Sequence, residues 1–213
     1  MSVNLRHRDD FELLPENSDR FASSKWYGLS RVGGEKNYET RFKAVYSDTG
    51  IYFLFCCEDQ KITAELEEDG ADLFTEDVIE VFLQPDEVYP VYMEYEISPL
   101  NRELVLLVSH NGEKFYGWMP FHYTGARRTK HITWCETGVP VSGAALQEWW
   151  AMIYIPFSLF EGAISGNVGP GTVWRGNIFR IDHDHEEVSR YAYAPACGTE
   201  FHDYEKFDKV MFL

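Results

Sequence analysis

The feature that most constrains the fold of this chain is an apolar pattern that repeats every second residue. In segment 147–155, Trp149, Ala151 and Ile153 fall on one face of an extended strand. Segment 51–57 is apolar on both faces, which is typical of a strand that lies between two covering layers. The same reasoning predicts further strands at 42–46, 78–83, 91–98, 104–109, 114–118, 132–135, 174–182 and 210–213.

Turn signals separate these strands and leave little room for helix. Asp48-Thr49-Gly50 lies between two of them, and Asn111-Gly112 is a strong hairpin signal. Helical turns are expected only in 61–74, around Ala64–Glu68, and in 158–161. Since no segment has the composition of a linker, we expect residues 1–213 to form one all-β domain, an antiparallel β-sandwich with very little helix.

The charge of the chain limits its partners. The 213 residues include 35 acidic and 19 basic side chains, which gives a formal net charge of −16. This charge would repel nucleic acid and anionic membranes, so neither is an expected partner. The first ten residues have no apolar core or cleavage site of a signal peptide, which predicts a cytoplasmic protein, or a secreted one if a leader has been removed.

The four cysteines do not form a recognisable framework. Cys56 and Cys57 are neighbours on a predicted strand and would face opposite ways, and no CxxC pair is present. We expect four reduced thiols. The alternative is a single bridge between Cys135 and Cys197.

Two strands carry charged residues among apolar ones. Glu80 lies between apolar residues of its face, and Asp77 comes directly before that strand. A buried carboxylate needs a partner, which an arginine or the hydroxyls of a sugar could supply. Arg180, on the same face as Asp182, suits a bidentate pair with a carboxylate, and Glu80 is the obvious candidate. These side chains therefore form either a structural ion pair or ligand contacts.

The run Asp182-His183-Asp184-His185-Glu186-Glu187 alternates metal-ligand types. It does not fit an EF-hand loop, because Glu187 stands where glycine is required and Tyr193 where glutamate is required. The simplest interpretation is a solvated acidic loop, with no cofactor required. The alternatives are a structural calcium ion on Asp182 and Asp184, or a catalytic metal held by the two histidines.

No nucleophile elbow, zinc-protease motif or phosphate loop is present, so no catalytic residue is expected. Several aromatic residues lie near loops instead. A flat ring at a strand end can pack on the C–H face of a sugar while polar side chains at the rim bind its hydroxyls. The candidates are Trp26, Tyr27, Phe74, Trp118, Trp134, Trp174, Tyr191 and Tyr193.

Six segments, in order, resemble the family 9 carbohydrate-binding modules and their stand-alone relatives, over about residue 25 to the end. The most specific is Phe74–Leu83, with its aromatic, Asp, Val, Glu, Phe signature. The others are Thr40–Phe53, Cys57-Glu58-Asp59, Trp149–Phe157, Asn177–Arg180, and the closing Tyr193-Ala194-Pro195 with Phe201–Phe207.

The resemblance implies an immunoglobulin-like β-sandwich that binds a mono- or oligosaccharide and is associated with xylanases in carbohydrate catabolism. The family's xylanase-linked member holds a sugar end between two tryptophans, with acidic and amide groups on the hydroxyls, and carries structural calcium. By position, Phe74 and Tyr193 correspond to the two aromatics. Glu80, with Asp77 before it, corresponds to the acidic contact, and Arg180 lies on the strand that lines the pocket.

Three functions follow as hypotheses. The first is a non-catalytic carbohydrate-binding domain. The second is a glycoside hydrolase, which would need two carboxylates about 5–9.5 Å apart, drawn from Glu80, Glu94 and Glu96. The third is a sandwich that has lost its sugar site and binds a protein, since neither expected aromatic is a tryptophan.

Overall fold

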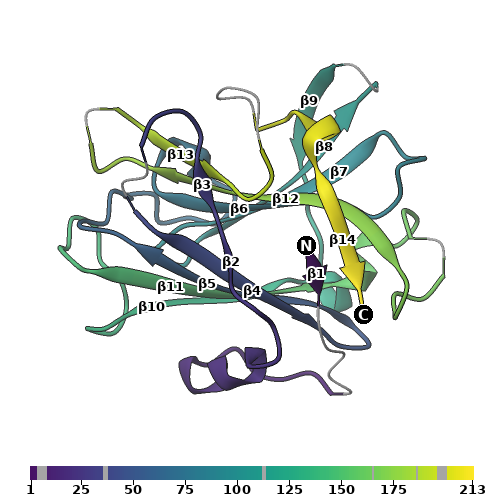
Figure 1. The fold of residues 1–213 in the computed structure, drawn as a ribbon, viewed down its shortest axis with the longest axis horizontal. Helices are drawn as coiled ribbons and strands as arrows, with labels where there is room; N and C mark the ends of the chain where they lie inside the picture. The colour runs from purple at the N-terminus through teal and green to yellow at the C-terminus, as the bar shows by residue number, and fades with distance from the viewer. Residues whose placement is uncertain (4–8, 36–37, 112–113, 165, 186, 196–200) are drawn as a thin grey trace.

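The computed structural model describes residues 1–3, 9–35, 38–111, 114–164, 166–185, 187–195 and 201–213. Within them, two β-sheets pack face to face as a sandwich (Figure 1). The larger sheet has the path β1-β14-β12-β6-β7-β8-β9, with β13 paired to β12 and β3 to β13. The smaller sheet has the order β10-β11-β5-β4-β2. Strand pairing is antiparallel apart from the parallel β1–β14 pair.

The larger sheet consists of β1 (Ser2–Val3), β3 (Ser30–Arg31), β6 (Val78–Gln84), β7 (Val91–Ile97), β8 (Glu103–His110), β9 (Phe115–Pro120), β12 (Val173–Asp182), β13 (Ser189–Ala192) and β14 (Asp208–Phe212). The smaller consists of β2 (Tyr27–Gly28), β4 (Thr40–Tyr46), β5 (Gly50–Glu58), β10 (Lys130–Cys135) and β11 (Glu148–Pro156). Every strand predicted from the apolar pattern is present. The pattern missed β1, β2, β3 and β13, which are two to four residues long.

The helical elements among the described residues are short 3₁₀ turns: η1 (Pro15–Phe21), η2 (Leu73–Thr75), η3 (Gly125–Arg127), η4 (Phe157–Phe160) and η5 (Tyr204–Lys206). The turn expected at 158–161 corresponds to η4. The helix expected around Ala64–Glu68 is wrong, because the backbone N–H groups of Glu65 and Leu66 donate to the Glu76 carboxylate at 2.8 and 3.0 Å. These bonds hold the segment in a non-helical conformation. No described helix has the length and apolar character needed to cross a membrane.

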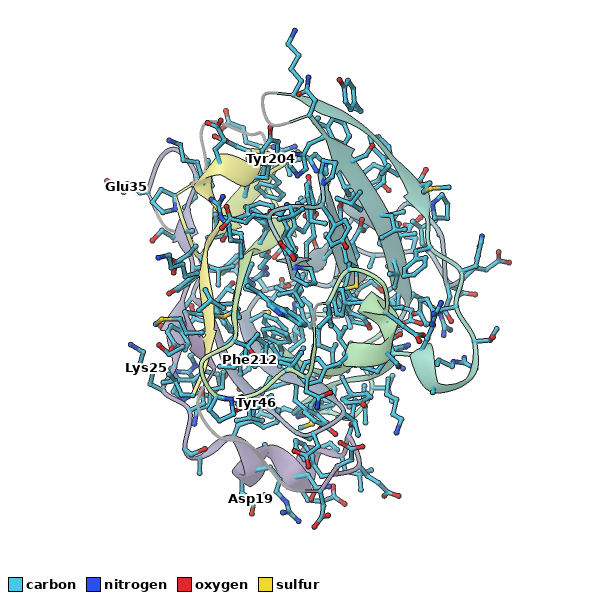
Figure 2. All side chains as sticks on the ribbon, turned by 90° about the vertical axis from the view of Figure 1, so that its right-hand side faces the viewer. Asp19, Lys25, Glu35, Tyr46, Tyr204 and Phe212 are labelled. Atoms are coloured by element: carbon cyan, nitrogen blue, oxygen red, sulfur yellow. The ribbon has the colours of Figure 1, made fainter. Side chains whose placement is uncertain are left out.

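Apolar side chains form three layers. Ile79, Val81 and Leu83 of β6 point into the core between the sheets, whereas Val78 and Phe82 point to the outer face of the larger sheet. This outer face is covered by η2 and by residues 201–207, and the outer face of the smaller sheet is covered by η1. Figure 2 shows the two covers, marked by Tyr204 and Asp19, at opposite sides of the sandwich. Apolar character on both faces of the central strands therefore reflects two covered sheets.

Three of the cysteines, Cys56, Cys57 and Cys135, are free thiols. Because Cys135 is a free thiol, the structure does not support the alternative bridge between Cys135 and Cys197. Cys197 itself lies outside the described residues. Burial raises the pKa of the Cys56 thiol to about 12, and raises that of Cys57 well above its ordinary value. Both thiols are therefore protonated and unreactive at neutral pH.

Candidate functional site

A pocket of about 200 Å³ lies on the outer face of the larger sheet. Strands β6, β7, β8, β12 and β13 form its floor and sides, η2 and the 201–202 segment cover it, and β9 at the sheet edge forms its rim. The lining residues are Phe74, Glu80, Glu94, Leu106, Trp118, Ile181, Arg190, Phe201 and His202. Six strands and two covering segments thus bring together residues that lie up to 128 positions apart, from Phe74 to His202.

The rim of the pocket is aromatic. The Phe74 and Trp118 rings meet edge to face, with centroids 6.3 Å apart and planes at 75°. Phe115 stacks on the His202 ring at 4.4 Å and on Trp118 at 5.7 Å. The Trp118 residue is 50% exposed. The rim therefore presents an accessible flat ring beside the polar groups of the floor, the combination that a sugar ring requires.

The floor of the pocket is acidic. Glu80 and Glu94 are only 2% and 4% exposed, and Glu96, directly opposite Glu80 in the β6–β7 register, is fully buried. All three side chains share the outer face, because residues two apart on a strand point the same way. Burial, and then the neighbouring carboxylates, raise the pKa of Glu80 and Glu96 well above the ordinary range. Burial raises the pKa of Glu94 to about 8.

Two nitrogen-bearing side chains complete the pocket. Arg190 of β13 lines the pocket near Glu80. Its positive charge lowers the pKa of the Glu80 carboxyl, but burial raises that pKa by more. His202 is linked through Nδ1 to the Tyr92 hydroxyl at 2.7 Å. Burial lowers the pKa of His202 to about 4, so the imidazole is neutral at pH 7. Arg190 is consequently the one permanent cation among the lining residues.

The structure brings together only two of the five residues predicted to bind sugar, Phe74 and Glu80. The predicted Arg180–Glu80 ion pair is wrong. In the β6–β12 register Phe179 lies opposite Glu80 and Arg180 lies opposite Ile79, so the two charged side chains leave opposite faces of the sheet.

Asp77, Arg180 and Tyr193 lie on the inner side of the larger sheet. The Asp77 carboxylate accepts backbone N–H bonds from Thr63 at 2.6 Å and from His183 at 2.8 Å. Tyr193 packs edge-on against Tyr27 and Phe42 in the core between the sheets, at centroid distances of 5.6 and 5.4 Å. Neither residue reaches the pocket, since both belong to the opposite face.

Arg180 is fully buried and is held by a different carboxylate group from the one expected. Its Nη2 donates to Asp59 at 3.0 Å and to Asp182, while Nη1 donates to the Thr40 hydroxyl and the Glu58 carbonyl at 3.0 and 2.6 Å. The inferred guanidinium–carboxylate pair therefore exists with other partners. Arg180 ties β12 to β4 and β5 across one end of the sandwich.

Beside Arg180, Asp59, Asp182 and Asp184 each offer a carboxylate oxygen within 4.8 Å of one another. Asp184 also accepts from the Tyr38 hydroxyl at 2.9 Å and from the backbone of Gln60 and Lys61 at 3.2 Å. Arg180 pairs with Asp59 and Asp182, and Asp184 adds a third carboxyl group beside them, so the carboxyl groups outnumber the cation. Hard oxygen ligands in such excess fit a calcium ion.

Sequence reasoning missed His202 and Arg190 as lining residues, and it named Trp118 only as one of eight candidate aromatic residues. Trp118 follows the Asn111-Gly112 hairpin signal, and its place at the rim depends on β9 pairing with β8. From the sequence alone, Glu94 is a candidate only as a catalytic carboxylate of a glycoside hydrolase. Glu94 and Glu96 are two residues apart on an apolar strand, and this spacing was the signal that their side chains would share one face.

A larger hollow of about 460 Å³ lies beside the paired ends of β6 and β12, near residues 84–87 and 172–175, and is also lined by Ile164 and Asn167. Its aromatic lining residue, Trp174, is 2% exposed and presents no free ring face. The 200 Å³ pocket is therefore the better candidate for a sugar site.

No protein-family model and no curated protein sequence matches the chain. Solved structures do match it. A proposed carbohydrate-binding protein from Bacteroides uniformis superposes with a TM-score of 0.80 at 16% identity, over 100% of this chain and 98% of the other. A family 9 carbohydrate-binding module from Caldicellulosiruptor kristjanssonii matches twice at 12% identity, over 100% of this chain. Its glucose complex gives a TM-score of 0.69 over 95% of that chain, and its cellotriose complex gives 0.67 over 93%.

The fold is that of the family 9 carbohydrate-binding modules. The expected immunoglobulin-like β-sandwich is thus confirmed, and the match extends over the whole chain. At these identities the similarity concerns the fold. The function is argued from the pocket and its side chains.

Proposed function

We propose that this protein is a non-catalytic carbohydrate-binding domain that holds a mono- or oligosaccharide in the pocket formed by Phe74, Trp118, Glu80, Glu94 and Arg190. The observation that carries the proposal is the combination of an exposed ring at the rim with carboxylates and a guanidinium on the floor. The two ligands of the similar C. kristjanssonii module, glucose and cellotriose, are its first candidates.

The role of each pocket side chain follows from the chemistry of a sugar ring. The Phe74 and Trp118 rings would pack against C–H faces, which removes apolar surface from water. The carboxyl groups of Glu80 and Glu94 would form hydrogen bonds with hydroxyls, and Arg190 would donate to ring or hydroxyl oxygens. The pocket has room for one pyranose unit, and the half-exposed Trp118 would meet a second unit at the rim.

Isothermal titration calorimetry with glucose and cellotriose tests the proposal. Replacing Phe74 by Ala should weaken binding about tenfold or more, equivalent to about 1.4 kcal/mol, through loss of the ring face. Tyr89→Ala is the matched control, since Tyr89 is 43% exposed and outside the pocket. An unchanged affinity in Phe74→Ala would place the site elsewhere. Absence of heat with every sugar tested at about 100 mM would favour a protein-binding sandwich instead.

A glycoside hydrolase is a second candidate, because Glu80 and Glu94 face the same pocket. We expect no turnover of aryl glycosides by the purified protein at high concentration. Hydrolysis that disappears in Glu80→Gln would instead support catalysis.

We infer in addition that Asp59, Asp182 and Asp184 would hold a structural calcium ion. The surplus of carboxylates over Arg180 supports this inference. A thermal unfolding midpoint several degrees higher in calcium than in chelator, with the difference absent in Asp184→Asn, is the expected result. Equal midpoints in calcium and chelator would contradict it.

A further inference from the structure

The acidic floor of the pocket gathers three carboxyl groups beside a single permanent cation. Glu80, Glu94 and Glu96 lie on one face of β6 and β7, and all three are at least 96% buried. A buried carboxylate without a cation or hydrogen-bond donors costs several kcal/mol. Across the described residues, Arg190 is the only permanent cation that lines the same pocket.

The charges are unevenly distributed within this group. Arg190 lowers the pKa of Glu80, whereas no lysine or arginine among the described residues lowers the pKa of Glu94 or Glu96 to a comparable degree. Oε2 of Glu94 and both carboxyl oxygens of Glu96 have no hydrogen-bond donor among the described residues. The Glu94 and Glu96 carboxyls approach each other within hydrogen-bonding reach, a contact that is favourable only when they share a proton. The free acceptor capacity of the floor is therefore concentrated at the Glu94–Glu96 pair.

Glu94 is also the member of this pair that a ligand can reach. It lines the pocket, whereas Glu96 has no exposed surface. His202, 4.0 Å from Glu94, is a neutral imidazole at pH 7, since burial lowers its pKa to about 4, and so supplies no charge. A donor that satisfies Glu94 must come from the ligand. A donor that carries positive charge would also allow both Glu94 and Glu96 to ionise, which a hydroxyl cannot do.

We propose that the pocket selects a sugar bearing a primary ammonium group, such as a 2-amino-2-deoxyhexose, with the ammonium on Glu94 and its neighbour Glu96. This selectivity rests on the proposed function, since the sugar ring would still pack on Phe74 and Trp118. Arg190 and Glu80 would remain for the hydroxyls on the other side of the pocket. The ammonium would displace the proton that the two glutamates share, and that proton would pass to solvent.

Calorimetric titration with glucosamine, N-acetylglucosamine and glucose at pH 7 tests the selectivity. We expect glucosamine to bind about tenfold or more tightly than glucose, since a charge-assisted hydrogen bond replaces a neutral one. N-acetylglucosamine, which has the same ring without the charge, should bind no more tightly than glucose. Ethanolamine, an amine without the sugar ring, should not bind measurably.

Two variants separate the pocket from general attraction of cations by an acidic protein. Glu94→Gln preserves the shape of the side chain and should reduce the ratio of glucosamine affinity to glucose affinity to within about threefold. Glu87→Gln removes one charge from a side chain that is 68% exposed and lies outside the pocket, and should leave the preference unchanged.

The outcomes distinguish this inference from the proposed function. If glucose binds and glucosamine binds no better, or if the preference survives Glu94→Gln, the ammonium selectivity is wrong and the sugar site stands. If ethanolamine binds as tightly as glucosamine, the floor is a general amine site and the selectivity for a sugar is wrong. If no sugar binds, both the selectivity and the proposed function fail.

Discussion

At the scale of single residues, Glu94 links the chemistry of the pocket to the pH dependence of folding. Burial raises its pKa to about 8, compared with an ordinary value of 4.5. Between these two pH values the folded chain binds more protons at this position than the unfolded chain does. The contribution of Glu94 to stability is therefore present below pH 4.5 and is lost as the pH rises towards 8.

Replacing Glu94 by Gln should consequently remove part of the alkaline loss of stability. We expect the free energy of unfolding of the variant, relative to the unmodified protein, to rise by about 1–3 kcal/mol between pH 5.5 and pH 8.5. Urea denaturation at both pH values measures this difference, with Glu87→Gln as the control. Parallel pH profiles for Glu94→Gln and the unmodified protein would show that Glu94 ionises normally in the folded state.

Arg180 provides the second test at this scale. Its guanidinium is fully buried between Asp59 and Asp182. Arg180→Met removes the cation and leaves two buried carboxylates unpaired, which should lower the free energy of unfolding by about 3–5 kcal/mol. Arg180→Lys keeps the charge but loses the forked guanidinium that reaches both carboxylates. Its free energy of unfolding should therefore lie between those of the unmodified protein and Arg180→Met. A loss below about 1 kcal/mol in Arg180→Met would contradict the structural role of this group.

At the scale of strands and loops, the close packing of β12 against β6 depends on one glycine. A Cβ atom at Gly176 would lie 2.4 Å from the backbone oxygen of Phe82, so that the two strands would have to separate. Gly176→Ala should cost about 1–3 kcal/mol of stability and weaken sugar binding, because β6 carries Glu80. Gly28→Ala, where the added atom meets nothing within 4 Å, is the control. Equal unfolding midpoints for the two variants would refute this account of β12.

The strands show what a sequence pattern can and cannot supply. β5, β6 and β11 were predictable because each is a long apolar run that is buried on at least one face. The helix expected around Ala64–Glu68 was wrong because good helical propensity was overridden by bonds to Glu76, a residue eight or more positions away. Short edge strands such as β3 bury too little surface to leave a pattern.

The candidate site was harder to predict than the fold because it depends on register. Glu80 and Phe74 come from one continuous motif, and the structure places both in the pocket. Arg180 and Glu80 come from different strands, and a shift of one residue in pairing reverses the face on which a side chain lies. Periodicity within a strand shows which residues share a face. It does not show which face of the neighbouring strand they meet.

At the scale of the whole molecule, the sandwich has a covered outer face on each sheet. The cover of the larger sheet, which consists of η2 and the 201–207 segment, leaves the pocket open beside the edge strand β9. The smaller sheet is closed by η1, where Phe21 is fully buried. Ligand binding is therefore expected on one face of the molecule, and the tryptophans of the two sheets can report on it separately.

The location of the sugar site is the central claim, and fluorine NMR of protein labelled with 5-fluorotryptophan tests it most directly. Among the six tryptophans, Trp118 lies at the pocket, while Trp26 is 38% exposed and packs against Trp150 of the smaller sheet, with ring centroids 6.1 Å apart. Trp118→Phe assigns the first signal and Trp26→Phe the second.

Titration with cellotriose should move the Trp118 resonance saturably and leave the Trp26 resonance in place. A Trp118 signal that stays fixed while another tryptophan responds would contradict the proposed location. Fixed signals throughout, up to about 100 mM ligand, would contradict sugar binding itself, because even a millimolar dissociation constant would then give near-complete occupancy.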